Sequence, residues 1–145
     1  MIIRRLYPED LTKDYYNLLN QLSSTEEPFD QNKFVSIFKD ITNKFPNQYN
    51  YVLVDPESNK IIGTITLLIE QKFLRGGRKI GHIEDVIVDK NYKGQGLGKF
   101  LVESIIQECK EHGCYKCILN CSENLEDFYK KCNLKKSNIQ MSIYF

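Results

Sequence analysis

The sequence predicts one mixed α/β domain, with a single sheet flanked by helices. Runs rich in β-branched and aromatic residues alternate with segments whose apolar residues recur at helical spacing, and turn-forming residues separate the two kinds. No repeat, linker or low-complexity stretch divides the chain. A length of 145 residues fits one domain that can bury a sizeable core, so we expect residues 1–145 to fold as one unit.

The first third of the chain predicts one strand and two helices. Residues Ile2–Leu6 are typical of a short strand, which Tyr7-Pro8 closes. We expect Asp10 to cap a first helix. Its apolar face is formed by Leu11, Tyr15, Leu18 and Leu22. We expect Asp30 to cap a second helix, which Pro46 ends, with an apolar face formed by Phe34, Phe38, Ile41 and Phe45.

Strands dominate the middle of the chain. The β-rich runs Tyr49–Val54 and Ile61–Ile69 are separated by Asp55–Asn59, a segment with strong turn signals. A second turn, around Gly76-Gly77, leads into a strand from Lys79 to Val88.

The last third predicts a helix, a strand, a short helix and a final strand. The first helix stops near Gly113 and has an apolar face formed by Leu97, Leu101, Ile105, Ile106 and Cys109. Tyr115–Asn120 predicts a strand, and Leu125–Cys132 a short helix that Asn133 can end in the left-handed conformation. We expect Ile139–Phe145 to close the sheet. The predicted order is β-α-α-β-β-β-α-β-α-β, a mixed α/β layer.

Composition excludes several classes of protein. Hydrophobic residues make up 41% of the chain and charged residues 27%, as in ordinary globular proteins. Twenty basic residues against nineteen acidic ones give a net charge of +1, which provides no electrostatic footprint for nucleic acid or an acidic membrane. No apolar run approaches the ~20 residues of a membrane span, and the N-terminus lacks the apolar region of a signal peptide. We therefore expect a protein of the cytoplasm.

The five cysteines predict free thiols and no metal site. An odd number of cysteines without a secretion signal argues against a disulfide framework. Cys114 and Cys117, beside His112, have a spacing found in zinc sites. On a strand, however, these two side chains would point to opposite faces, and the second pair of a structural zinc site is missing. We expect the cysteines to pack as small buried hydrophobes.

Residues Lys93–Lys99, Lys-Gly-Gln-Gly-Leu-Gly-Lys, carry the strongest functional signal. They follow a predicted strand and open a predicted helix, and their alternating glycines leave backbone N–H groups able to converge on an anion. The helix adds the unpaired N–H groups of its first turn and the positive end of its dipole. We expect a phosphate-bearing ligand here, with an unliganded glycine-rich loop as the alternative.

Two common phosphate-binding motifs do not fit this turn. A P-loop needs glycine at the position of Lys93 and a hydroxyl at that of Phe100, and the dinucleotide fingerprint needs glycine at that of Lys99. The remaining pattern is a basic residue and Gly-x-Gly-x-Gly after a strand ending in Val88-Asp89. It resembles the pyrophosphate-binding turn of the GNAT superfamily of acetyl-CoA-dependent N-acetyltransferases.

Four segments narrow the resemblance to one family within that superfamily. They occur in one order and register: Gly81–Val86, Gly94–Lys99, Gly113–Lys116 and Phe128–Cys132. They are similar to those of glucosamine-6-phosphate N-acetyltransferases, densely from Ile80 to Cys132 and thinly before Tyr49 and after Leu134. The resemblance implies the GNAT acyl-CoA N-acyltransferase fold, a mixed and mostly antiparallel sheet flanked by helices. It also implies that the protein transfers the acetyl group of acetyl-CoA to glucosamine 6-phosphate, a step in the synthesis of UDP-N-acetylglucosamine. The family forms homodimers whose sites are shared between the subunits.

The resemblance further implies roles for individual residues in catalysis and cofactor binding. Tyr129 would give its proton to the departing coenzyme A thiolate, although a core tyrosine is the alternative. Glu84, Asp85 and Asn120 would address the amino sugar. The N–H of Val86 would stabilise the oxyanion. The residues implied to bind acetyl-CoA are Val86, Ile87, Val88, Lys93, Gly94, Gln95, Gly96, Leu97, Gly98, Lys99, Asn124, Phe128 and Tyr129.

The resemblance assigns the sugar phosphate to the basic turn around Gly76-Gly77. Such a run of charge is usually a solvated hairpin tip. Here Lys72 and Arg75 match a family segment that contacts the phosphate across the dimer, and they are better candidates than Arg78 and Lys79. Ser23, in the first loop, would replace a substrate-binding threonine.

Three positions depart from the family pattern and concern the substrate more than the cofactor. Asn120 stands at a usually acidic position, Tyr144 where an arginine usually binds phosphate, and Asn124 one residue before the usual asparagine. Two alternatives follow: a GNAT enzyme that acetylates another amine, or a non-catalytic acetyl-CoA-binding module. The basic turn argues against a polyamine substrate, and the presence of Tyr129 with two carboxylates argues against a non-catalytic module.

Overall fold

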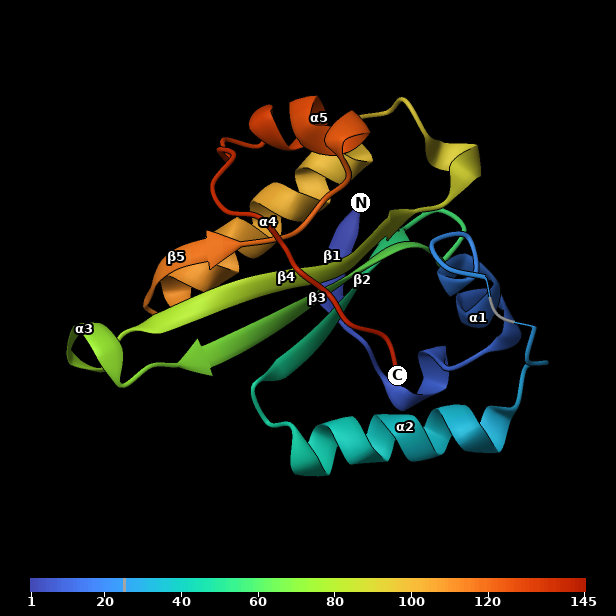
Figure 1. The fold of residues 1–145 in the computed structure, drawn as a ribbon. Coiled ribbons are helices and arrows are strands. Elements are labelled where there is room, and N and C mark those ends of the chain that lie inside the picture. Colours follow the sequence, from blue (N-terminus) through green and yellow to red (C-terminus); the bar gives the residue numbers. More distant parts are fainter. Residues whose placement is uncertain (25) are drawn as a thin grey trace.

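A computed structural model, which describes residues 1–24 and 26–145, contains a five-stranded sheet with the strands in sequence order (Figure 1). The first four strands pair with one another in antiparallel fashion, and the fifth strand is parallel to the fourth. The strands are β1 (Ile2–Arg5), β2 (Gln48–Asp55), β3 (Lys60–Gln71), β4 (Lys79–Val88) and β5 (Cys114–Ile118). The prediction of a mixed, mostly antiparallel sheet flanked by helices is therefore confirmed.

Helices cover both faces of this sheet (Figure 1). On one face lie α4 (Leu97–Glu111) and α5 (Glu126–Lys130), and on the other α1 (Lys13–Leu19) and α2 (Gln31–Lys44). The short elements are η1 (Pro8–Asp10), α3 (Leu74–Gly77), η2 (Lys90–Tyr92) and η3 (Glu123–Leu125). Within the described residues, none of the helices is both long and apolar enough to cross a membrane.

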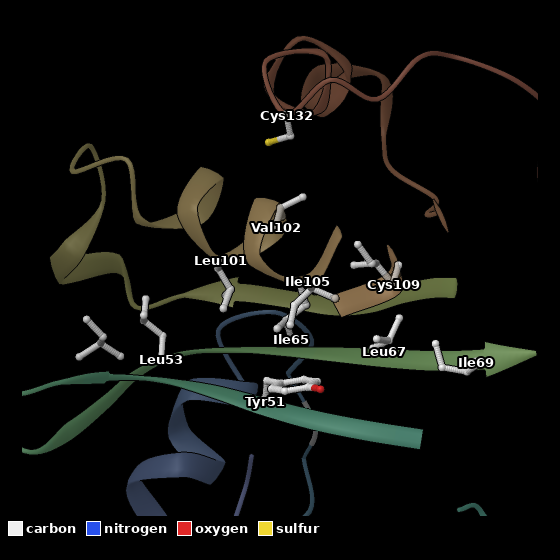
Figure 2. Close-up of a cluster of buried hydrophobic side chains, with 12 residues drawn as sticks. Tyr51, Leu53, Ile65, Leu67, Ile69, Leu101, Val102, Ile105, Cys109 and Cys132 are labelled. Carbon is white, nitrogen blue, oxygen red and sulfur yellow. The ribbon is translucent and has the colours of Figure 1, made fainter. Parts of the chain in front are cut away.

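The alternation of side chains along the strands builds a separate core on each face. Tyr51 and Leu53 of β2 belong to the core beneath α4, and Val52 and Val54 to the core beneath α1 and α2. Figure 2 shows the first of these cores, with side chains of β3 facing those of α4. Because α4 packs here through fully buried Leu101, its N-terminus is held firmly beside the end of β4.

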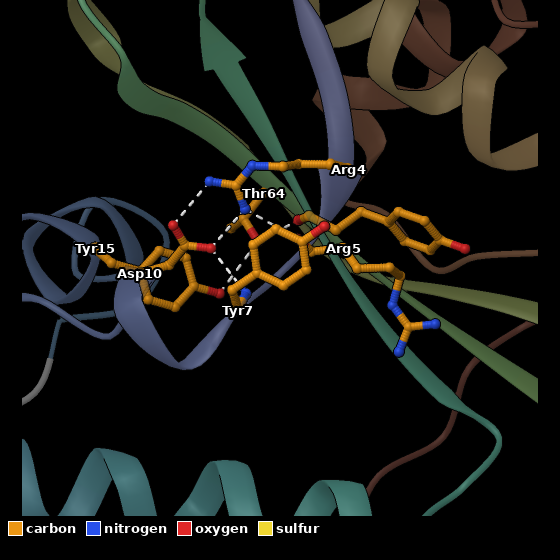
Figure 3. Close-up of polar contacts among 7 residues, drawn as sticks. Arg4, Arg5, Tyr7, Asp10, Tyr15 and Thr64 are labelled. Atoms are coloured by element: carbon orange, nitrogen blue, oxygen red, sulfur yellow. Dashed lines mark hydrogen bonds and ion pairs between the residues drawn. The ribbon is translucent and has the colours of Figure 1, made fainter.

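The predicted cap of the first helix is wrong. Asp10 forms a two-pronged ion pair with Arg4, at 2.6 and 2.9 Å, and accepts the backbone N–H of Tyr7 (Figure 3). Burial opposes the charge on Asp10, but these hydrogen bonds outweigh it and lower the pKa of the carboxyl group. Thr12 caps the helix instead, because its hydroxyl accepts the N–H of Tyr15. The second predicted cap, Asp30, is confirmed by its hydrogen bonds from the first turn of α2.

The predicted final strand is also wrong. Residues 134–145 form no helix or strand in this single chain, and Ile139 and Met141 are each 91% exposed. Other predicted elements differ less: β5 stops at Ile118, before the predicted end at Asn120, and the predicted short helix divides into η3 and α5. Asn133 has the left-handed conformation predicted for it, with a φ of 65°.

Candidate functional site

The C-terminal half of β4 departs from regular pairing on both of its edges. On the β3 side the register breaks between Glu84 and Ile87, where two residues of β4 face a single residue of β3. This bulge includes Asp85, whose φ of 52° is left-handed. On the β5 side, pairing ends at His82. In the described part of the chain, residues 83–88 therefore present an edge that an extended ligand can occupy.

The glycine-rich turn follows this open edge after the short helix η2. Gly94 and Gly96 have φ values of 79° and 75°, which other residues adopt only at a cost. Gly96 immediately precedes α4, and no side chain caps the helix there. A Cβ atom at either glycine would meet nothing within 4 Å, so the turn borders open space. The unpaired N–H groups of the first turn of α4 are thus available to a phosphate.

The side chains of the turn add positive charge near this space. Lys93 and Lys99 are both exposed, and the ammonium of Lys99 lies 3.7 Å from Glu103 Oε1 within the same helix. Gln95 is exposed, whereas Leu97 packs against the core and anchors the start of the helix. The structure therefore places the predicted residues 93–96 in the turn before α4 and residues 97–99 in the first turn of that helix.

The third glycine of the turn has a packing role. A Cβ atom at Gly98 would lie 3.2 Å from Cζ of Phe128, which is closer than most such contacts allow. The Phe128 ring also packs edge-on against Tyr129, with centroids 4.9 Å apart. The phenylalanine thus connects the turn at the start of α4 with the predicted proton donor on α5. The resemblance implied that Phe128 binds the cofactor but did not show this contact.

Tyr129 and Asn120 line one cavity of about 970 Å³, bordered by β5, α5 and residues 133–140. Tyr129 is half-buried, and burial, with the nearby Cys121 and Cys132 thiols as lesser causes, raises the pKa of its phenol. Because the phenol stays protonated at neutral pH, it can act as a hydrogen-bond and proton donor.

The end of β5 leaves the predicted polar residues accessible. Asn120 lies two residues beyond the strand and is exposed, so its carbonyl is not tied into the sheet as the predicted strand implied. Asn124 lies in η3 and accepts a short hydrogen bond from the Ser122 hydroxyl. Both side chains are open to a ligand approaching from the solvent.

The two predicted carboxylates have different environments. Glu84 is half-buried, whereas Asp85, in the bulge, is exposed. Burial raises the pKa of Tyr15 on α1, and the negative charge of Asp85 also acts to raise it. The Tyr15 hydroxyl lies 3.2 Å from that of Thr64, so the helix is fixed to the sheet at this point (Figure 3).

Ser23 lies at the same end of β4. Gln21, two residues earlier, donates to Asp89 Oδ2 at 3.0 Å and accepts the N–H of Lys90 at 2.9 Å. These bonds hold the start of the loop after α1 beside the residues that follow β4. Ser23 itself is exposed.

The predicted phosphate-binding residues lie at the opposite end of β4. Arg75 has a φ of 54° at the tip of the β3–β4 hairpin, and its guanidinium lies 5.2 Å from the centre of the Tyr115 ring. Lys72 forms an ion pair with Glu70, which also lies 2.8 Å from His82 Nε2. The hydrogen bond from Lys72, followed by that from His82, lowers the pKa of Glu70. The charge of Lys72 is therefore partly balanced within its own chain, which the sequence did not show.

One chain does not bring the two ends together. Lys79, where β4 begins, is five residues from Glu84, which corresponds to about 16 Å of extended strand, and the hairpin tip lies further out. Figure 1 shows α3 at one extreme of the sheet and the turn before α4 at the other. Arg75 therefore does not reach the carboxylates of its own chain. Tyr144, in the exposed C-terminal segment, is 93% exposed.

Comparisons with known proteins show what this chain is similar to. Residues 9–134 match the Acetyltransferase (GNAT) family. A glucosamine 6-phosphate N-acetyltransferase of Arabidopsis thaliana is 42% identical over 99% of this chain and 95% of its own length. Glucosamine 6-phosphate N-acetyltransferase 1 of Dictyostelium discoideum is 40% identical over 97% of this chain and 88% of its own length. A crystal structure of the Arabidopsis enzyme superposes with a TM-score of 0.91 at 41% identity, covering 99% of this chain and 97% of that one.

Proposed function

The chain belongs to the GNAT acetyltransferase family, and we propose that it transfers the acetyl group of acetyl-CoA to the amine of glucosamine 6-phosphate. The products are coenzyme A and N-acetylglucosamine 6-phosphate, an intermediate towards UDP-N-acetylglucosamine. The observation that carries the proposal is the continuity at the end of β4, where an open backbone edge leads into a glycine turn that is capped by no side chain.

Acetyl-CoA fits an open strand edge that continues into a phosphate-binding turn. Residues 86–88 would pair with the amide groups of pantetheine, since the β5 side of that segment has no partner strand in the described chain. The pyrophosphate would then lie on the N–H groups of Gly94, Gly96 and the start of α4, with Lys93 and Lys99 supplying charge. The thioester would be left beside the bulge at Asp85.

The reaction needs positioning more than covalent catalysis. The amine of an amino sugar loses its proton near the ~7.7–8.0 of an α-amino group, so much of it is reactive at neutral pH. Attack on the thioester forms an oxyanion, which the N–H of Val86 would stabilise. Coenzyme A departs as a thiolate, and Tyr129, kept protonated by its raised pKa, would donate the hydrogen bond that strengthens as charge develops.

The amino sugar would lie between the end of β4 and the end of β5. Glu84 and Asp85 supply two carboxylates for its hydroxyl and ammonium groups, and Ser23 lies at the same end of the sheet. Asn120 keeps a main-chain carbonyl for the amine but lacks the charge that an acidic residue would provide. The substrate would therefore rely on the β4 carboxylates for charge.

A homodimer would complete the phosphate site. Arg75 lies too far from the carboxylates of its own chain, but the hairpin tip could reach the site of a second copy. The tip exposes apolar Phe73 (105%) and Leu74 (73%), and residues 139–145 expose an alternating apolar pattern that has no partner in one chain. Surfaces of this kind mark interfaces. We propose that both are covered in a two-fold dimer, where Arg75 and Lys72 contact the partner's sugar phosphate.

Release of free coenzyme A thiol from acetyl-CoA, measured with a panel of amines, tests the proposed activity. We expect glucosamine 6-phosphate to be acetylated far more efficiently than glucosamine, a polyamine or an N-terminal peptide. Glucosamine reacting as well as its 6-phosphate would favour another amine substrate. No thiol release with any amine, in a protein that binds acetyl-CoA, would favour a non-catalytic module.

Subunit complementation tests the shared site separately. Arg75→Ala and Tyr129→Phe chains are unfolded together, refolded as mixed dimers, and assayed at low glucosamine 6-phosphate. If Arg75 serves the partner's site, one site of each mixed dimer carries both changes and the other carries neither. About one quarter of all sites would then be intact with random pairing. No recovery of activity above the two parent proteins would show that each chain uses its own Arg75.

A further inference from the structure

Two thiols lie against each other between α4 and β5. All five cysteines are free, and the Cys109 thiol donates a hydrogen bond to Cys117 Sγ over a sulfur–sulfur distance of 3.2 Å. Gly81 makes this arrangement possible, because a Cβ atom there would lie only 2.4 Å from Cys109 Sγ. The two sulfur atoms need to approach by only about 1 Å to reach the length of a disulfide bond.

The two thiols have unequal environments. Cys109 is 2% exposed and packs in the main core, shown in Figure 2, whereas Cys117 is half-buried and lines the 970 Å³ cavity. The hydrogen bond to Cys117, together with burial, raises the pKa of Cys109. Accepting that hydrogen bond lowers the pKa of Cys117. Cys117 is thus the accessible and more readily ionised member, and Cys109 is its enclosed neighbour.

We propose that Cys109 and Cys117 form a modification site, a dithiol that a small disulfide such as oxidised glutathione converts into an intramolecular disulfide joining α4 to β5. The Cys117 thiolate attacks one sulfur of glutathione disulfide, forming a mixed disulfide and releasing one glutathione thiolate. Cys109 then loses its proton and attacks the Cys117 sulfur, releasing the second glutathione. The two protein thiols are oxidised by two electrons, and glutathione disulfide is reduced to two thiols.

Cys117 differs from the other accessible cysteines because its thiol contacts that of Cys109. Cys121 is exposed and reacts without an enclosed partner, while Cys132 directs its thiol to the Phe128 carbonyl at 3.6 Å. Cys114 is half-buried and is the nearest competitor. The first step places a glutathionyl group in the cavity that Cys117 lines, and the second step removes this group, so the cavity is open again.

Peptide mapping of the full-length Cys121→Ser protein tests the proposal. The protein is treated with oxidised glutathione at mildly alkaline pH, blocked with a thiol alkylating reagent and digested without reduction. Trypsin cleaves after Lys99, Lys110 and Lys116, so each remaining central cysteine falls in its own peptide: 100–110, 111–116 and 117–130. We expect peptides 100–110 and 117–130 to be linked, and dithiothreitol to separate them. Alkylated thiols at both positions, or a link from Cys114, would overturn the proposal.

Two further variants test the order of the steps. Adding Cys109→Ser to the Cys121→Ser protein should leave a stable glutathionyl group on Cys117, because no thiol removes it. Adding Cys117→Ser should leave Cys109 unmodified, because it is enclosed, and glutathione on Cys109 would contradict the proposed order. Adding Cys132→Ser is the matched control, which should keep the link. If a buried substitution prevents folding, the map of the Cys121→Ser protein decides alone.

Discussion

The two ends of β4 are built in different ways. At the C-terminal end the groups proposed to bind the cofactor are mainly backbone groups, along the open edge beyond His82 and in the turn at Gly94 and Gly96. At the hairpin end they are side chains, with Arg75 over the Tyr115 ring and Lys72 paired with Glu70. The proposed cofactor site at the first end is formed by one chain, whereas the second end carries charge and exposed apolar residues without a proposed substrate site beside it.

This difference indicates which changes each end tolerates. A site formed by backbone groups depends on the conformation of the chain. Replacing a glycine that this conformation requires should therefore disrupt the site, whereas many substitutions at its other positions should not. A side-chain site depends on single charged groups, each worth a limited amount of binding energy. Changes at the turn are therefore expected to act on the cofactor and to be severe. Those at the hairpin should act on the sugar phosphate and be moderate.

Gly96→Glu should abolish acetyl-CoA binding and leave the fold intact. The turn borders open space, so the new carboxylate would occupy and repel the pyrophosphate site. Gly96→Ala is the matched control: it adds only the conformational cost of a side chain at a φ of 75°, about 1–2 kcal/mol. Calorimetric titration with acetyl-CoA measures the effect, and unchanged affinity in folded Gly96→Glu protein would refute a cofactor site at this turn.

Tyr129→Phe should reduce turnover by ~10²–10⁴, the usual effect of removing a general acid, with little change in acetyl-CoA affinity. The phenyl ring keeps its place beside Phe128, so the change removes only the hydroxyl. Steady-state thiol release with saturating substrates measures it. Tyr49→Phe, in the part of β2 next to His112, is the control. A loss below about threefold would show that water or another group protonates the sulfur.

Arg75→Ala should raise the apparent KM for glucosamine 6-phosphate by roughly tenfold or more, since a hydrogen bond to a charged group is worth ~1.5–3 kcal/mol. Acetyl-CoA affinity should barely move. Arg78→Ala, at the same hairpin tip, is the matched control and should have a much smaller effect. Initial rates over a range of sugar phosphate measure both. Equal effects of the two substitutions would mean that the hairpin tip acts through its net positive charge and not through a specific contact of Arg75.

Gly98→Ala should have the smallest effect. The new methyl group would lie 3.2 Å from the Phe128 ring, so the ring must move by a few tenths of an ångström. We expect a loss of about 1 kcal/mol in stability, typical of mild overpacking, and a severalfold decrease in kcat through displacement of Tyr129. Adding Phe128→Leu should partly restore kcat by relieving the contact. Chemical denaturation and kcat measure the two effects, and wild-type kcat would show that the contact does not position Tyr129.

Local sequence signals predicted the C-terminal end of β4 and the turn that follows it well. A glycine turn needs only residues that are adjacent in the chain, so the spacing in Lys93–Lys99 sufficed to locate it. The same holds for the bounds of β4, Lys79–Val88, and for the cap at Asp30. The break in β4 pairing at Asp85 was not visible, because a bulge depends on the register of a second strand.

Interactions between different helices and strands explain what the sequence did not show. Asp10 has the right type and place for a helix cap, but the ion pair with Arg4 on β1 uses its carboxylate. Ile139–Phe145 has the alternation of a strand, but one chain offers it no strand to pair with. The contact between Cys109 and Cys117 requires α4 to lie on β5, which spacing alone does not reveal. Whether the predicted site residues bind substrate stays a prediction.

The order of the strands has a consequence for folding. Strands β1 to β4 are neighbours in the sheet in the same sequence in which they leave the ribosome, so most of the sheet can form by adding one antiparallel strand at a time. Only the β4–β5 pair needs a crossover, and this crossover is the glycine turn and α4. The longest connection joins β1 to β2 (residues 6–47), and the connection between β4 and β5 (residues 89–113) is also much longer than the turns between β2, β3 and β4. Strand pairs that close over a longer span usually organise late. We therefore expect the β4–β5 pair, with the glycine turn between its strands, to form after the folding transition state, so that acetyl-CoA would slow unfolding without speeding folding.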